Sequence, residues 1–140
     1  MIELNKIKQT LLAKLAEKYG LELVLLFGSR ISGKTHKESD YDIGYLSSRP
    51  LGLIEEGKLI IDLMPVLEVN DERLINLVNI KKSTPLLLYS MTAKCQILHE
   101  GQPALFANLR AAAFKEYLEL KPLYETRERR LKRLIKSYDL

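Results

Sequence analysis

The chain has 140 residues, of which 46% are hydrophobic and 29% charged, a balance typical of one soluble globular domain with a buried core. No apolar run reaches the length of a membrane span and no signal-peptide pattern opens the chain, so an integral membrane protein is not expected. The single cysteine, Cys95, excludes an internal disulfide and fits a reducing, cytoplasmic compartment. The net charge of +4 permits an acidic or phosphate-bearing partner.

The first expected element is an amphipathic helix from Ile2 to Tyr19, followed by Gly20 as a C-cap. Apolar residues recur in it at helical spacing, and lysines occupy the other face. This apolar stripe consists of Ile7, Leu11, Leu12, Leu15 and Ala16. An apolar run from Leu23 to Phe27 then predicts a buried strand.

The strand ends at a turn that suits a phosphate group. Gly28 lets the backbone turn tightly, and the backbone N–H groups and the hydroxyl of Ser29 are expected to face an anion. A short helix that began there would add its dipole to the attraction. Arg30 and Lys34 could reach phosphates, although a solvated basic side chain is the more frequent case. Gly33 is expected to end the short helix or to allow a close backbone approach.

Two aspartates open the next strand, which is expected from Tyr41 to Leu46. Asp40 and Asp42 are two residues apart, and strand residues with this spacing point to the same face. Carboxylates held together repel one another unless a cation lies between them, and oxygen ligands of this kind suit Mg²⁺, which often takes further ligands from phosphates. A Gly-Ser turn alone is usually only a turn, and an Asp-x-Asp pair is often a solvated edge. Their ordered combination favours a nucleotide site.

Gly28-Ser29, ten intervening residues and Asp40-Tyr41-Asp42 resemble the signature of the DNA polymerase beta-like nucleotidyltransferase superfamily. Within it, Phe27–Arg30, Gly33 and Ser39–Ile43 look like the minimal nucleotidyltransferase (MNT) branch. That branch includes the antitoxins of HEPN/MNT toxin–antitoxin pairs, some of which transfer AMP from ATP to a tyrosine of the HEPN toxin.

This resemblance covers the chain to about Gly101. It implies ATP as the substrate, Mg²⁺ as the metal and a HEPN toxin as the protein partner. The residues expected to bind the nucleotide are Gly28, Ser29 and Arg30, and those expected to be catalytic metal ligands are Asp40 and Asp42.

Four more elements are expected before the chain breaks at Gly101-Gln102-Pro103. They are a helix at Leu53–Leu67 disturbed by Pro65, a third strand at Leu74–Ile80, a helix capped by Thr84-Pro85 that runs to about Ala93, and a short strand at Gln96–His99. The apolar stripe of the first of these helices is expected to contain Leu53, Ile54, Ile60, Ile61, Met64 and Leu67.

The third strand is where the chain departs from its family. The resemblance implies a third acid that shares the metal and accepts the proton of the attacking hydroxyl, and the aligned residue here is Asn76. An alternative alignment uses Asp62, but it deletes the helix at Leu53–Leu67, so Asp62 is interpreted as an exposed helix residue. An asparagine keeps one metal-binding oxygen but cannot act as a base.

From Ala104 to Tyr138 the pattern is helical, and Pro122 is expected to bend or divide the helix. The segment from Arg127 to Lys136 is rich in basic residues, which usually means a solvated face. The alternative is a docking arm whose apolar ridge contacts a partner or the domain. This ridge consists of Leu123, Tyr124, Leu131, Leu134 and Ile135.

The expected fold is α/β (α+β), with a small mixed sheet of three or four strands, a nucleotidyltransferase core at residues 1–101 and a helical extension at 102–140. The favoured function is an MNT antitoxin that transfers AMP to a HEPN toxin. The alternative is an antitoxin weakened by Asn76 that neutralises a HEPN ribonuclease by binding alone. Direct nucleic-acid binding is not expected, because the basic tail lacks interleaved stacking aromatics.

Overall fold

The computed structural model describes residues 1–32 and 40–138. The predictions for Gly33 and Lys34 lie outside these residues. Four strands form one mixed sheet in the order β3-β2-β1-β4, in which β2 and β4 run antiparallel to β1 and β3 runs parallel to β2. The strands are β1 Leu21–Phe27, β2 Tyr41–Ser47, β3 Ile75–Asn79 and β4 Gln96–Glu100. The expected α/β class and mixed sheet are therefore confirmed.

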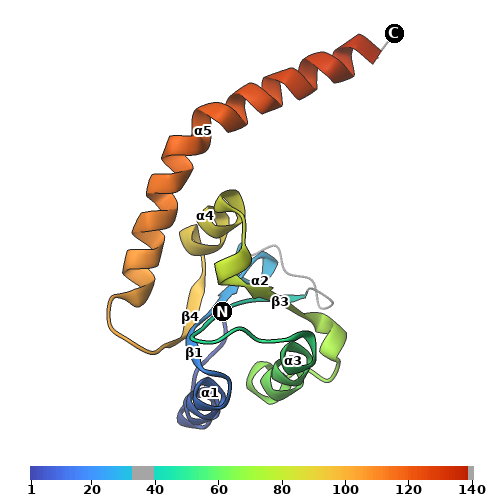
Figure 1. The fold of residues 1–140 in the computed structure, drawn as a ribbon. Helices are drawn as coiled ribbons and strands as arrows, with labels where there is room; N and C mark the ends of the chain where they lie inside the picture. The colour runs from blue at the N-terminus through green and yellow to red at the C-terminus, as the bar shows by residue number, and fades with distance from the viewer. Residues whose placement is uncertain (33–39, 139–140) are drawn as a thin grey trace.

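Helices cover both faces of this sheet (Figure 1). They are α1 Lys6–Tyr19, α2 Ser29–Ser32, α3 Leu53–Leu67, the 3₁₀ turns η1 Glu72–Leu74 and η2 Ile80–Lys82, α4 Pro85–Ala93 and α5 Leu105–Tyr138. Alternate residues of β1 enter two separate cores, since strand side chains alternate between faces. Val24 and Leu26 belong to the core that contains α1 and α3, whereas Leu23 and Leu25 pack with Met91 of α4.

Helix α1 begins four residues later than predicted, at Lys6, because Asn5 caps it by accepting a hydrogen bond from the Lys8 N–H. The preceding residues are held to β4 instead. The Ile2 N–H donates to Gln96 Oε1 at 2.8 Å, and Gln96 Nε2 donates to the Ile2 carbonyl at 2.7 Å. The predicted C-cap at Gly20 is confirmed, with a left-handed φ of 68°. Ile7 lies outside the core, with 72% of its surface exposed.

Helix α3 has the predicted bounds but buries a different face. Leu53, Ile54 and Ile61 of the expected stripe are exposed. The buried residues are Leu59, Leu63, Val66 and Leu67. The helix is apolar on more than one side, so its periodicity does not identify the face that meets the sheet.

Helix α5 packs on the sheet side only through its first turns. Leu105, Phe106 and Leu109 contact the core around Met91. Further along, the Tyr117 ring stacks on the Tyr89 ring of α4 with centroids 3.9 Å apart. The helix then bends and continues past α4 (Figure 1), and Pro122 lies inside it, as predicted. Over residues 1–32 and 40–138, no helix has the length and apolar character needed to cross a membrane.

Candidate nucleotide site

The turn after β1 has a left-handed glycine at its first position. Gly28 has φ +81°, a conformation that a residue with a Cβ adopts only at a cost. Helix α2 begins at the next residue, Ser29, and the Ile31 N–H donates to the Gly28 carbonyl at 3.1 Å. The predicted sequence of strand, tight turn and short helix is confirmed.

Asp42 lies directly against this turn. It is the register partner of Phe27 in the antiparallel pair of β1 and β2. A Cβ added to Gly28 would lie 3.0 Å from Asp42 Cγ and would collide with a carboxylate oxygen. Two features therefore require glycine at this position: the left-handed backbone angle, and the space beside it that the Asp42 carboxylate occupies.

Asp40 lies one residue before β2, and its side chain is exposed. Within the two described ranges, no lysine or arginine forms an ion pair with either Asp40 or Asp42. The two acids that the sequence singles out are thus left available to an external cation by the described part of the chain.

Asn76 lies beside Asp42 on the neighbouring parallel strand. The two residues are register partners, and Asn76 Nδ2 donates to Asp42 Oδ1 at 3.1 Å. The residue predicted to align with the third acid is therefore within hydrogen-bonding distance of Asp42, the candidate metal ligand. Its amide is uncharged, and its hydrogen bond orients the Asp42 carboxylate.

Asp62 lies elsewhere, on α3. Its carboxylate accepts hydrogen bonds from the Tyr19 hydroxyl at 2.6 Å and from Lys18 Nζ at 2.9 Å. The hydroxyl is the main cause that lowers the pKa of Asp62, and Lys18 acts in the same direction. The prediction that Asp62 lies on a helix is confirmed. The prediction that it is exposed is wrong, because its side chain is only 30% exposed and its hydrogen bonds join α3 to α1.

The Arg30 guanidinium lies over the Tyr41 ring, 4.1 Å from its centroid. Tyr41 and Asp42 are adjacent in β2, so their side chains leave the strand on opposite faces. The sequence analysis missed this cation–π contact, and no local pattern signals it, because the two residues are eleven positions apart. The role of Arg30 in binding nucleotide stays a prediction.

The oxygen donors at this site fit Mg²⁺. Asp42 presents a carboxylate beside the turn, and Asn76 can present an amide oxygen if its side-chain amide turns over. Asp40, two residues before Asp42, is exposed and stays a predicted second carboxylate of the site. Over the described ranges, no cluster of three or more His, Cys, Asp or Glu side chains could hold a metal. Mg²⁺ in proteins is commonly bound by one or two carboxylates, with phosphate and water oxygens as its other ligands, and the donors of this site are of that kind.

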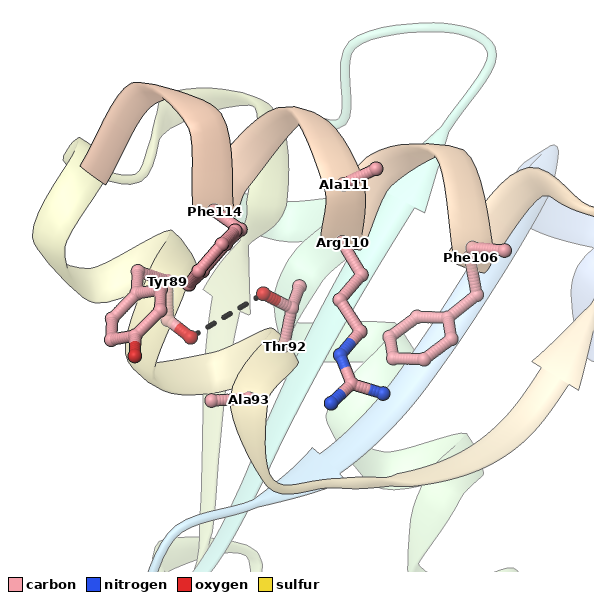
Figure 2. Close-up of a pocket in the computed structure, with 8 residues that line it drawn as sticks. Tyr89, Thr92, Ala93, Phe106, Arg110, Ala111 and Phe114 are labelled. Atoms are coloured by element: carbon pink, nitrogen blue, oxygen red, sulfur yellow. Dashed lines mark hydrogen bonds between the residues drawn. The ribbon is translucent and has the colours of Figure 1, made fainter. Parts of the chain in front are cut away.

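An apolar groove of about 540 Å³ lies apart from these residues, between α4 and α5 (Figure 2). Its walls include the rings of Tyr89, Phe106 and Phe114, and Arg110 projects among them. None of the predicted site residues lines it. The groove is a candidate contact surface.

A strand, a tight turn with Gly28 in the left-handed conformation and an aspartate on the adjacent strand are the arrangement that the sequence resemblance to nucleotidyltransferases implies. The family model described as "Polymerase beta, Nucleotidyltransferase" matches residues 5–103, and the chain belongs to this family. No protein with a curated description matches the sequence.

Several solved structures with this fold come from toxin–antitoxin complexes. A chain of a toxin–antitoxin crystallised with AMP-PNP superimposes with a TM-score of 0.70 at 21% identity, covering 89% of this chain and 98% of that one. A chain of the MntA–HepT complex superimposes with a TM-score of 0.66 at 18% sequence identity, covering 91% of this chain and 99% of that one. A chain from the complex of a tri-AMPylated Shewanella oneidensis HEPN toxin with MNT antitoxin has a TM-score of 0.66 at 18% identity, covering 91% of this chain and 98% of that one. At these identities the likeness establishes the shared fold.

Proposed function

We propose that the protein is an MNT-type antitoxin that transfers AMP from ATP to a tyrosine of a HEPN toxin in the cytoplasm. The observation that carries this proposal is the contact of the Asp42 carboxylate with the left-handed turn at Gly28. Two comparisons support it, since one neighbour was crystallised with AMP-PNP and another contains an AMPylated HEPN toxin.

The roles follow from position. The turn at Gly28 and Ser29 would hold the triphosphate, and Asp40 and Asp42 would hold Mg²⁺. The ion, when bound, supplies positive charge that offsets the charge of the phosphates. In the reaction the tyrosine oxygen bonds to the α-phosphorus, the bond from that phosphorus to the pyrophosphate oxygen breaks, and pyrophosphate leaves.

The proton of the attacking hydroxyl needs an acceptor, and this is where Asn76 matters. A carboxylate at this position could accept the proton, whereas an amide cannot. With Asn76 the proton has to pass to solvent water, and without a general base the transfer is expected to be slower by about 10²–10⁴-fold. The nucleotide can still bind, because the turn at Gly28 and the carboxylates of Asp40 and Asp42 are present whether residue 76 is an acid or an amide.

A second candidate is an antitoxin that neutralises a HEPN ribonuclease by binding alone. The observation in its favour is the hydrogen bond from Asn76 to Asp42, in which the amide occupies the position expected of the base. Both candidates require the same partner, and they differ in whether the toxin becomes covalently modified.

Labelled ATP, Mg²⁺ and a purified cognate HEPN protein distinguish the two candidates. Wild type and Asn76→Asp are compared, with Asn79→Asp as the matched control. Asn79 accepts the Lys81 N–H at 3.0 Å, a bond that an aspartate also makes. Label on the HEPN protein with wild type supports transfer. If only Asn76→Asp transfers label, the wild type leaves the enzyme class and the binding antitoxin remains.

A further inference from the structure

The second half of α5, Pro122–Tyr138, is called the C-terminal arm below. It continues beyond α4, away from the sheet (Figure 1). Five large apolar side chains on it are 54–80% exposed: Leu123, Leu131, Leu134, Ile135 and Tyr138. Most helical stability in proteins comes from packing of an apolar face, and the apolar face of the arm packs on no other element of the described chain. The arm therefore has the features of a surface that another molecule covers.

The exposed apolar residues form one face. At the helical angle of about 100° per residue they fall within a sector of about 120°. Arg127 lies within the same sector, four residues after Leu123 and four before Leu131. A guanidinium between apolar neighbours loses hydration when the face is covered, so it needs a carboxylate opposite it.

The arm also carries the positive charge of the chain. Six basic and two acidic residues give it a formal charge of +4, which equals the net charge of all 140 residues, so the remainder is balanced. The basic residues are Arg127, Arg129, Arg130, Lys132, Arg133 and Lys136. A complementary surface must therefore be acidic as well as apolar.

Three other occupants fit less well. A second copy of the arm would bring like charges together. A nucleic acid would leave the leucines and Ile135 without apolar cover, and a bilayer would have to accommodate Arg127 in the buried face. An acidic protein surface satisfies the charge and the apolar face together.

We propose that the C-terminal arm docks on an acidic, apolar surface of the protein partner, with Arg127 paired to a carboxylate of that surface. This inference rests on the proposed function, in which the partner is a HEPN toxin. The groove beside Arg110 also places a guanidinium among apolar side chains, there the rings of Tyr89, Phe106 and Phe114. It lies on the half of α5 that leads to the arm.

The test measures the Kd between the full-length chain and the purified cognate HEPN protein. Arg127→Glu is compared with Arg129→Glu, which makes the same charge change on the opposite side of the helix. Arg127→Glu is expected to weaken binding by about 30-fold or more, and Arg129→Glu by about 3-fold or less. Leu134→Ser is expected to cost about 10-fold. Because the arm lies off the core, all three variants should keep the unfolding temperature of wild type.

Two results would overturn the inference while leaving the proposed function in place: wild-type affinity in Arg127→Glu and Leu134→Ser, or equal losses in both charge reversals. The same variants are tested on duplex RNA and on phosphatidylserine vesicles, where specific binding by wild type at physiological salt would assign the arm to that ligand instead. If the HEPN protein does not bind the wild type at all, the proposed function fails and the inference falls with it.

Discussion

Gly28 meets two demands at once, a left-handed backbone and room for the Asp42 carboxylate. Gly28→Ala is expected to cost about 1–2 kcal/mol of stability from the backbone angle alone, and it should also displace Asp42 and abolish measurable AMP-PNP binding. Thermal unfolding and calorimetric titration check the two effects.

Gly57→Ala is the matched control. A Cβ at Gly57 has nothing within 4 Å, and the residue lies inside α3. This variant should be more stable than wild type by about 0.5–1 kcal/mol and should bind AMP-PNP normally. Equal binding by both alanine variants would show that the turn does not hold the nucleotide.

Asn76→Asp tests how the site responds to a third carboxylate. The variant replaces a hydrogen bond to Asp42 with like-charge repulsion, so it should unfold at a lower temperature than wild type in EDTA. With Mg²⁺ and AMP-PNP its unfolding temperature should rise further than that of wild type, because a third oxygen anion strengthens the hold on the cation. If the unfolding temperature of Asn76→Asp does not respond to Mg²⁺, residue 76 does not lie at a metal site.

Individual residues were predictable where a local rule fixes them. Gly20, Gly28 and Thr84 are examples, since caps and tight turns restrict residue type within a few positions. The contact of Arg30 with Tyr41 was not predictable, because it depends on where two elements meet in space. Asn5 is a residue type that commonly caps helices, and this local signal places the start of α1 at Lys6 rather than at the predicted Ile2.

Among the elements, α1 and α3 are joined by the carboxylate of Asp62. Its pKa is lowered chiefly by the hydrogen bond from the Tyr19 hydroxyl, so it binds a proton less readily in the folded than in the unfolded chain. The contribution of this bond is present above roughly pH 4, the ordinary pKa of an aspartate, and is lost as pH falls through the lower folded value.

Asp62→Asn should therefore flatten the acid limb of the stability curve, as measured by urea unfolding between about pH 5 and pH 2. The variant should leave any nucleotide transfer unchanged. A loss of transfer without a loss of stability would show that Asp62 acts in the reaction although it lies on α3 and bonds to α1.

The strands β1 and β2 were predictable because they are short apolar runs that the fold buries. For the helices, the periodicity of apolar residues predicts that a helix forms but does not always identify the face that it buries. Leu53, Ile54 and Ile61 of α3 are as apolar as the residues that it buries. The choice of face depends on how α3 meets α1 and the sheet. The strand order, and with it the placement of Asn76 beside Asp42, follows from tertiary pairing that the local pattern does not contain.

For the whole molecule, the first half of α5 packs on the core, and the second half is the proposed docking arm. We expect a chain that ends at Lys121 to fold and to unfold within a few degrees of full length, since it retains the residues that cover Met91. The same chain should no longer bind the HEPN protein.

A chain that ends at Gly101 is the contrasting case. It lacks Leu105, Phe106 and Leu109, whose burial contributes about 3 kcal/mol or more, a large share of the stability of a small domain. We expect it to aggregate, as measured by light scattering during heating. Similar melting of both truncated chains would support residues 1–101 as a core that is independent of the extension at 102–140.

The pairing of Asn76 with Asp42 has an evolutionary consequence. Asparagine and aspartate codons differ at their first base alone, and the parallel strands already hold residue 76 beside Asp42. If position 76 is that of the third acid, as we propose, one point mutation would exchange a stoichiometric inhibitor for a modifying enzyme. Genetic selection against a co-expressed toxin would recover that mutation directly.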